Sequence, residues 1–227
     1  MLITLPDLLP REEARAYRTA LAQARWLDGR QTAGHVASRV KANRQLALGD
    51  PLARRIGQRI VQALQGDPVF QSAVLPARIL PPRFNRYEGG EHYGFHIDNA
   101  LFRRPDDAGL IRCDVSTTVF FSDPDDYDGG ELVVQDTYGE QRVKLPAGAA
   151  VIYPGTSLHQ VTPVTRGVRL GAFFWTQSLV RDDHRRSLLL QQDVAIQRLI
   201  NDRAESEIIA GLTGVYHNLL RLWADPT

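Results

Sequence analysis

The chain is poor in cysteine and has no long apolar run, and each shortage excludes some classes of protein. Cys113 is the one cysteine in 227 residues, so no internal disulfide and no cysteine-rich zinc module can form. We expect Cys113 to fill space in the core. No apolar run approaches the roughly 18 residues that a membrane span requires. The N-terminal residues MLITLPDLLPREEARAY gain proline and acids too early for a signal peptide, which predicts a cytoplasmic protein without a membrane partner.

The chain also lacks an excess of charge of either sign. Lys and Arg number 27 against 26 for Asp and Glu, so no basic field predicts a nucleic-acid partner. A Walker loop, a GxSxG element and a dinucleotide fingerprint are absent as well. What remains is a composition that is 43% hydrophobic, in a length suited to one domain or to one domain with a small appendage.

Residues 1–76 are expected to form a helical segment that supports the core. Apolar residues recur every three or four positions over residues 11–25, which predicts a helix. Asp50-Pro51 resembles an N-cap followed by proline at the first helical position, and the helix that follows should end at Gly66. Between these helices, residues 26–45 have no clear period and are expected to form a loop or a loose hairpin, in which Lys41 and Asn43 could act as a lid.

Residues 77–179 read as a β domain. Eight short runs, rich in β-branched and aromatic residues, are separated by turn signals that include Asp128-Gly129-Gly130 and the TRG of residues 165–167. No helical crossover lies between the runs, so parallel pairing is excluded and an all-β sandwich or barrel is expected. The runs are ARILPPRFNRY, HYGFHID, CDVSTTVFFS, GGELVVQD, QRVKL, AAVIYP, LHQVTPV and VRLGAFFWTQS.

Residues 180–227 return to a helical period and are expected to form a C-terminal helical subdomain. Asp182-Asp183 precedes one helix and Ser206 opens a second. The pair carries more apolar positions than two isolated helices can cover. We therefore expect it to pack on the β core or on a second subunit, with a homodimer favoured.

The stretch GEHYGFHIDNA, residues 90–100, raises the question of function. On a helix, His92 and His96 would share a face as in HExxH metalloproteases, but the position of the general base is Tyr93. Gly94 and the flanking aromatic residues favour a strand, on which His96 and Asp98 point the same way. On this strand His92 also shares the face of His96, where it is expected to be a rim residue. An HxD pair alone is better read as a surface histidine and aspartate that flank a turn, so the motif needs context.

The context of this pair is the run at 153–175. His159 begins one strand there, and Arg169 lies on the next. Two histidines and one carboxylate can occupy one face of an octahedral metal, an arrangement typical of non-haem Fe(II) oxygenases because it leaves positions for a co-substrate and O2. Arg169 among apolar neighbours needs a partner, and its planar fork suits a dicarboxylate co-substrate. The alternative partner is an acid in the core or at its rim.

In these features the chain resembles the bacterial PKHD-type hydroxylases, which are 2-oxoglutarate/Fe(II) dioxygenases related to prolyl and lysyl hydroxylases. The resemblance extends over WLDGRQTAG, VKANRQ, RFNRYEGGEHYGFHIDNA, DVSTTVFFSDPDDYDGGEL, YPGTSLHQVTPVTRG through Arg169, and the C-terminal helical pair. It implies a double-stranded β-helix (jelly roll), His96, Asp98 and His159 as iron ligands, and Arg169 as the residue that binds the distal carboxylate of 2-oxoglutarate. It further implies ascorbate as reductant and a link to the uptake of iron chelates.

Several neighbouring residues are secondary candidates. The resemblance favours Tyr87 slightly over Tyr93 as a contact of the co-substrate, although either could be core packing. His92, Tyr93 and Arg103 are candidates for a substrate rim, where Arg103-Arg104 could hold an acidic substrate or form a solvated pair.

The sequence thus predicts a dioxygenase that uses Fe(II), 2-oxoglutarate and O2. Its rivals are a jelly-roll metal isomerase or hydrolase, which would not need Arg169, and a non-catalytic sensor of iron or 2-oxoglutarate. The prime substrate is open between a peptidyl residue, a free amino acid and part of an iron chelate.

Overall fold

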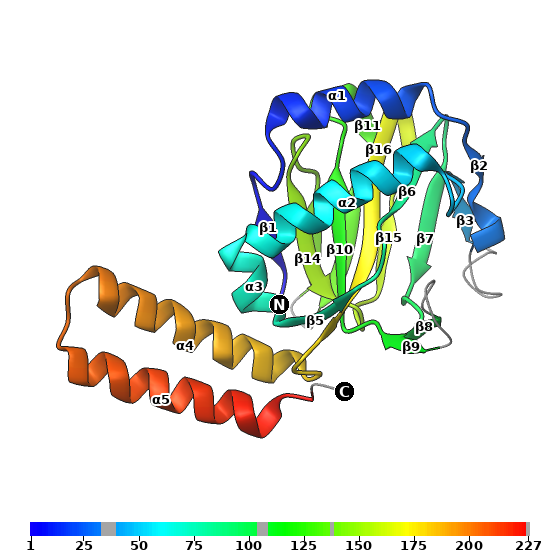
Figure 1. The fold of residues 1–227 in the computed structure, drawn as a ribbon. Coiled ribbons are helices and arrows are strands. Elements are labelled where there is room, and N and C mark those ends of the chain that lie inside the picture. The colour runs from blue at the N-terminus through cyan, green and yellow to red at the C-terminus, as the bar shows by residue number, and fades with distance from the viewer. Residues whose placement is uncertain (33–39, 104–108, 137–138, 226–227) are drawn as a thin grey trace.

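A computed structural model of the chain describes residues 1–32, 40–103, 109–136 and 139–225. Two sheets face each other, helices lie along the outer side of the larger sheet, and a helical hairpin extends away from this body at the C-terminal end (Figure 1). The structure confirms the mainly-β jelly roll with a C-terminal helical pair that the sequence predicts. Every pairing between described strands is antiparallel, also as predicted.

The larger sheet is built around one long strand, β16, with which four other strands pair directly. The order is β1 (Ile3–Leu5), β14 (Ala150–Pro154), β10 (Val115–Phe120), β16 (Val164–Ser178), β6 (Arg83–Glu88), β4 (Arg44–Gln45) and β2 (Leu27–Asp28). The short strands β5 (Pro76–Ile79) and β11 (Tyr127–Gly129) also pair with β16.

The smaller sheet carries the stretch that raised the question of function. Its order is β13 (Gly139–Val143), β12 (Leu132–Asp136), β15 (His159–Val161), β7 (His92–His96) and β3 (Lys41–Ala42), while β8 (Leu101–Arg103) and β9 (Leu110–Arg112) form a separate hairpin. Between the two sheets lies a cluster of buried side chains that includes Phe120, Leu132 and Val151. This cluster keeps the sheets together beside the site described below.

Strand β16 contradicts one predicted turn. The TRG of residues 165–167 was expected to separate two strands, but the strand continues through it. Gly167 has φ +72°, and a side chain there would meet the carbonyl of Asp126, so glycine permits the close pairing with β11. The expected bend at Asp128-Gly129-Gly130 is partly right: β11 runs to Gly129, and both glycines have positive φ.

Residues 26–45 are also more regular than the prediction of a loop. Where the structure describes them, they form β2, a short 3-10 helix at Gly29–Thr32, β3 and β4. Strand β3 pairs with β7 and β4 with β6, so this segment adds an edge to both sheets. Lys41 and Asn43 accordingly line the cavity between the sheets instead of closing over it. Residues 33–39 lie outside the described residues, and the first two of them end the WLDGRQTAG stretch of the resemblance.

Three helices cover the outer side of the larger sheet: α1 (Arg11–Ala22), α2 (Pro51–Gly66) and α3 (Pro68–Val74). The predicted cap of α2 is confirmed, because the Asp50 side chain accepts a hydrogen bond from the Ala53 amide. Helix α1 ends three residues earlier than its apolar period suggests, near the point where the Trp26 indole donates to the Leu21 carbonyl. A second core lies between these helices and the sheet.

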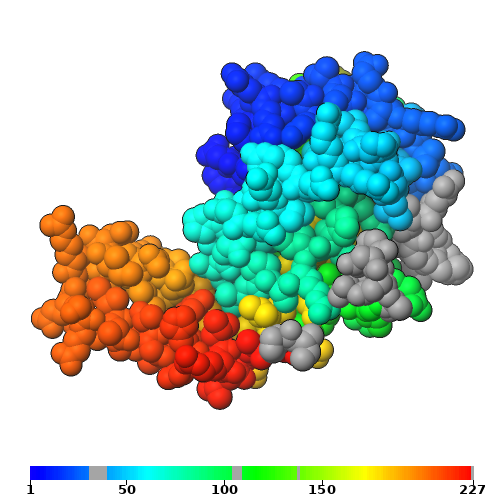
Figure 2. Space-filling model, in the orientation of Figure 1, coloured from blue at the N-terminus to red at the C-terminus, as the bar shows by residue number. Residues whose placement is uncertain are grey.

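The C-terminal hairpin consists of α4 (Asp183–Asn201) and α5 (Ser206–Trp223), which begin where the sequence predicts. Figure 2 shows it projecting from the body of the molecule. Leu75, Val180 and Leu189 form a small cluster at its base, where buried Arg186 donates to the Val180 and Arg181 carbonyls at 2.7 Å. In the described part of the chain, no helix combines the length and the apolar character needed to cross a membrane.

Candidate metal and co-substrate site

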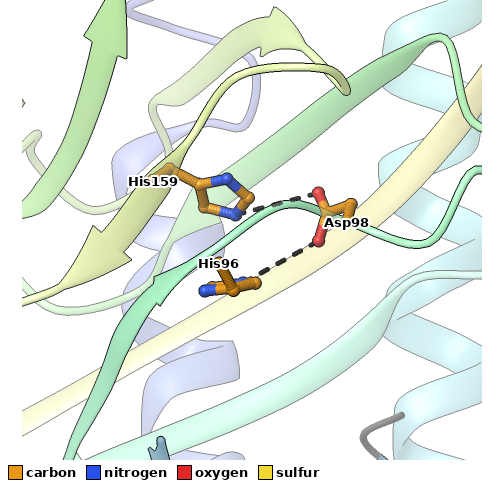
Figure 3. A group of neighbouring side chains, drawn as sticks. All are labelled: His96, Asp98 and His159. Carbon is orange, nitrogen blue, oxygen red and sulfur yellow. Dashed lines mark ion pairs between the residues drawn. The ribbon is translucent and has the colours of Figure 1, made fainter. Parts of the chain in front are cut away.

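His96, Asp98 and His159 converge at one end of the smaller sheet, with their side chains directed at one point (Figure 3). His96 ends β7, and His159 begins β15 directly opposite it. The chain leaves β7 so that Asp98 faces both rings, with Oδ1 3.9 Å from His96 Nε2 and Oδ2 3.8 Å from His159 Nε2. All three side chains are nearly buried. Residues from two separate stretches of the chain thus form one cluster, as the sequence predicts.

Both imidazole rings are oriented by their own strands. His96 Nδ1 lies 2.8 Å from the Gly94 carbonyl, and His159 Nδ1 lies 3.0 Å from the Ser157 carbonyl. A carbonyl only accepts, so each Nδ1 carries a proton and each Nε2 is the ring nitrogen left to face the cluster. Burial, together with the nearby His159 ring, lowers the pKa of His96 to about 4. The His96 ring is therefore neutral at pH 7, as metal coordination requires.

The carboxylate has a positioning partner that sequence reasoning missed. Ser116, on β10 of the opposite sheet, donates a 2.7 Å hydrogen bond to Asp98 Oδ2. Tyr153, opposite Ser116 on β14, places its ring 5.1 Å from His159. The available signal was the polar run Ser116-Thr117-Thr118 inside an otherwise apolar, fully buried strand, because buried polar groups need partners.

A bulge in β7 changes which residues face the cluster. His96 pairs with His159 and Tyr93 with Val161, so β7 contains one more residue than β15 over this stretch. Tyr93 consequently stacks on His96, with ring centroids 3.5 Å apart. His92 does not share the face of His96, contrary to the strand alternation assumed from the sequence. It bonds the Gly90 carbonyl and lies outside the lining of the cavity.

The donor set fits a divalent metal. One ligand atom from each of the three side chains lies within 4.8 Å of the other two, so the three side chains can converge on a single ion. Two imidazole nitrogens and one carboxylate oxygen are the ligands of a facial triad, which suits Fe(II) and leaves the other side of the metal open. That open side faces a cavity between the sheets of about 760 Å³, including its mouth.

Arg169 lies in the same cavity and is 1% exposed. It stands on β16 opposite Tyr87 of β6, with its guanidinium carbon 5.3 Å from the ring centroids of both Tyr87 and Phe120. Its Nε and Nη1 have no hydrogen-bond partner, and none of the described acids forms an ion pair with it. The salt bridge considered as an alternative is therefore absent from the described residues. A buried, unpaired fork in a cavity fits a carboxylate ligand.

Tyr87 is almost fully buried at the floor of this cavity. Its hydroxyl accepts a 3.4 Å hydrogen bond from the Asn85 amide, and Asn85 Oδ1 has no partner among the described residues. The phenol thus lies beside Arg169, where a bound dicarboxylate would reach it. Tyr93 reaches the cavity through its contact with His96.

Arg103 lies apart from this group. Its side chain borders a separate groove along α2 and Pro81-Pro82, and it is exposed. Arg104 lies outside the described residues. Cys113 is a free, buried thiol packed with Leu80, Ile111 and Trp175, which confirms its role as core filler.

Comparison with known proteins agrees with this geometry. The model of the 2OG-Fe(II) oxygenase superfamily matches residues 82–177, and that of the PKHD-type hydroxylase C-terminal domain matches residues 183–225. A PKHD-type hydroxylase of Bordetella pertussis is 59% identical over 99% of this chain and 100% of its own length. The PKHD-type hydroxylase PiuC of Pseudomonas aeruginosa is 53% identical over the same shares.

Among solved structures, a prolyl-4-hydroxylase of Pseudomonas putida superposes with a TM-score of 0.56 at 21% identity. The match covers 78% of this chain and 92% of that one, and it shows a shared fold. The sequence relatives extend over essentially the full chain, including the C-terminal hairpin. The chain therefore belongs to the PKHD-type hydroxylase family and carries the family's 2-oxoglutarate/Fe(II) oxygenase domain.

Proposed function

We propose that the protein hydroxylates a C–H bond of a prime substrate while 2-oxoglutarate is converted to succinate and CO2. His96, Asp98 and His159 would hold Fe(II), and Arg169 would bind the distal carboxylate of 2-oxoglutarate. The observation that supports this most directly is the buried, unpaired guanidinium of Arg169 in the same cavity as the three ligand side chains. An isomerase or hydrolase would have no use for such a group.

The side chains of the cavity have different roles in binding the metal and the co-substrate. The two Nδ1–H donors fix the rings so that Nε2 faces the metal, and Ser116 holds the Asp98 carboxylate. The fork of Arg169 fixes one end of the dicarboxylate, and Tyr87 is placed to donate to it. Apolar walls that include Leu132, Val161 and Phe174 exclude water. When bound, iron and 2-oxoglutarate supply the oxidising power for the reaction with O2.

Some features of this proposal rest on the family resemblance. Ascorbate would serve as reductant, and the activity would be linked to iron homeostasis or to the uptake of iron chelates. The protein would act in the cytoplasm on a small-molecule or peptidyl substrate, without nucleic-acid or membrane partners. Residues 1–76 would support the dioxygenase domain at 77–179, and residues 180–227 would form a separate subdomain.

We further propose that the protein is a homodimer. Ile208, Val215 and Leu222 on α5 are between 50% and 76% exposed and recur every seven residues, so they form one stripe along the helix. The neighbouring face of α5, which carries Tyr216, Leu219 and Leu220, is already partly buried. A second copy of the same hairpin offers a stripe of matching length.

Anaerobic binding of Fe(II) and 2-oxoglutarate, followed by succinate release in oxygen, tests the proposed reaction. The wild-type protein should show the visible charge-transfer band of the iron-bound co-substrate. In Arg169→Ala, iron should still bind while the KM for 2-oxoglutarate rises about 30- to 1000-fold, the equivalent of roughly 2–4 kcal/mol for a buried charge-assisted pair. Arg169→Lys keeps the charge but loses the fork and should recover part of this.

Arg78, an exposed arginine on β5 outside the cavity, provides the matched control. Arg78→Ala should leave the KM unchanged. If Arg169→Ala folds normally and its KM changes less than about threefold, the co-substrate anchor lies elsewhere. Binding of 2-oxoglutarate without any turnover would favour the sensor.

A further inference from the structure

The cavity carries more positive charge than the co-substrate needs. Among the described residues that line it are three cations, Lys41, Arg83 and Arg169, and one carboxylate, Asp98. The proposed reaction already assigns Arg169 to 2-oxoglutarate and Asp98 to the metal. A divalent iron and the dianionic co-substrate balance each other, as do Arg169 and Asp98. The charge of Arg83 is not explained by this set, and Lys41 lies beside it.

Of these two cations, Arg83 has the better-defined surroundings. It begins β6 opposite Phe173, and its guanidinium carbon lies 5.2 Å from the Phe102 ring centroid and 5.5 Å from that of Trp175. No described carboxylate forms an ion pair with it, and burial lowers its pKa. Other arginines of this sheet are paired: Arg86 with Glu88, and Arg44 with both Glu88 and Glu91. Arg83 therefore faces the cavity with its hydrogen-bond donors available.

Lys41 adds a second positive charge close to the metal ligands. It is 5% exposed, pairs with Tyr93 across β3 and β7, and places Nζ 5.1 Å from the Tyr93 ring. That ring in turn stacks on His96. Both cations line the same cavity, where burial and then Arg83 lower the pKa of Lys41 while Asp98 and Asp28 raise it. An anion bound between Lys41 and Arg83 would reduce their mutual repulsion.

We propose that the prime substrate carries a carboxylate or another planar oxyanion, bound by Arg83 and Lys41 beside the carbon that is oxidised. This rests on the proposed function, because the position of the co-substrate defines which part of the cavity remains. The guanidinium fork suits a planar anion. The stacked rings of Phe102 and Trp175, 4.3 Å apart, form a flat apolar wall next to it. The substrate would thus combine the anion with a flat or apolar body.

A matched pair of probes tests this without knowledge of the substrate. The full-length protein is loaded with Ni(II) and 2-oxoglutarate and titrated with para-fluorobenzoate or para-fluorobenzamide, with binding followed by fluorine NMR. The two probes share shape and aromatic ring and differ in charge. The wild-type protein should bind the carboxylate at least about tenfold more tightly than the amide, as expected for a charge-assisted contact. Retention of 2-oxoglutarate is measured in the same samples.

Arg83→Met removes the guanidinium but keeps an unbranched apolar side chain next to Trp175, and it should abolish the preference for the carboxylate while 2-oxoglutarate affinity is unchanged. Arg83→Lys should keep part of the preference for the carboxylate probe. This variant replaces Arg83→Met in the experiment if the methionine variant does not fold. Arg78→Met, the same change on an exposed strand position, should behave as wild type.

The outcomes separate this inference from the proposed function. Equal binding of the two probes to a protein that holds 2-oxoglutarate normally overturns the anionic substrate alone. Displacement of 2-oxoglutarate by the benzoate also overturns it, because the anion then occupies the site of Arg169. A protein that binds neither nickel nor 2-oxoglutarate contradicts the proposed function itself.

Discussion

Each histidine of the cluster receives its orientation locally, from a carbonyl two residues earlier in its own strand. The Gly94 and Ser157 carbonyls fix the tautomers of His96 and His159 without help from distant segments. Asp98 differs, because it follows the end of β7 and depends on Ser116 from the opposite sheet. The carboxylate is thus the ligand whose position relies most on how the two sheets pack.

Removal of the Ser116 hydroxyl should weaken the metal site without loss of the fold. In Ser116→Ala, the Asp98 carboxylate loses its 2.7 Å donor, and we expect Fe(II) affinity to fall about 10- to 100-fold. Anaerobic titration measures this. Ser122→Ala is the control, since Ser122 is equally buried but bonds Val168 and Leu170, so it should lower the melting temperature and leave metal affinity unchanged. Unaltered affinity in Ser116→Ala would show that Asp98 holds its position unaided.

The buried charge of Lys41 should destabilise the folded protein, so replacement of this lysine should raise the free energy of unfolding. Burial and Arg83 lower its pKa to about 8, while Asp98 and Asp28 act in the opposite direction. A lysine whose folded pKa is lowered destabilises the fold fully below the folded pKa, and the penalty disappears as the pH rises towards the ordinary value near 10.4. Lys41→Met should therefore raise the unfolding free energy of the metal-free protein at pH 7 by about 1–3 kcal/mol, with a smaller gain at pH 10.

Urea unfolding at the two pH values measures this difference. Lys41→Met should also bind the para-fluorobenzoate probe less tightly than wild type does. The reason is that the ammonium group that destabilises the fold is also the group proposed to bind the anion. A variant that is less stable than wild type at pH 7 would show that contacts of the lysine outweigh its desolvation.

The residue types of the site could be predicted from the sequence for a physical reason. Few residues serve as iron ligands, and an arginine inside an apolar strand requires a partner, so HxD, His159 and Arg169 together restrict the chemistry. Ser116, Lys41 and Arg83 were not singled out as site residues in this way. Their importance arises from which strands face each other across the cavity, and that depends on pairing over long sequence separations.

At the scale of elements, β16 connects most of the molecule, since it pairs with β5, β6, β10 and β11 and carries Arg169. Helix ends were predictable where a local signal exists, as at Asp50-Pro51, Asp182 and Ser206. Helix α3 carries the same kind of cap at Asp67-Pro68, yet its seven residues are too few to show a period. Strands of two residues, such as β3 and β4, have no periodicity at all and form only because neighbouring edges are available.

The turn wrongly predicted at residues 165–167 leads to a test of backbone conformation. Gly167 has φ +72° inside β16 and contacts the Asp126 carbonyl, so Gly167→Ala should destabilise the protein by at least about 2 kcal/mol. Gly214→Ala makes the same chemical change in α5, away from the proposed interface and with no atom near the new methyl group, and it should stabilise the protein by about 0.5–1 kcal/mol. Thermal melts compare the two. A neutral Gly167→Ala would mean that β11 can detach at little cost.

At the scale of the whole molecule, the site and the C-terminal hairpin are separate structures. The hairpin extends from the body on the side of α3 (Figure 1), and the residues that line the cavity come from strands of both sheets. α5 buries none of its side chains fully. An apolar helix that projects in this way should associate in water, because monomeric proteins seldom expose a continuous apolar patch. The two-subunit arrangement proposed above would cover it and leave both cavities open.

Val215 lies at the centre of the α5 stripe, and Val215→Asp should therefore convert the dimer to a monomer. A charge buried there without a partner costs several kcal/mol, and the dimer would contain two such charges, one in each copy. Analytical ultracentrifugation measures the mass, and iron and 2-oxoglutarate binding should be unchanged because the residue is remote from the cavity. Ala210→Asp adds the same charge to an exposed position of the same helix that lies away from the stripe, and it should remain dimeric. A wild-type protein that sediments as a monomer, or a Val215→Asp protein that stays a dimer, would show that α5 is not the interface.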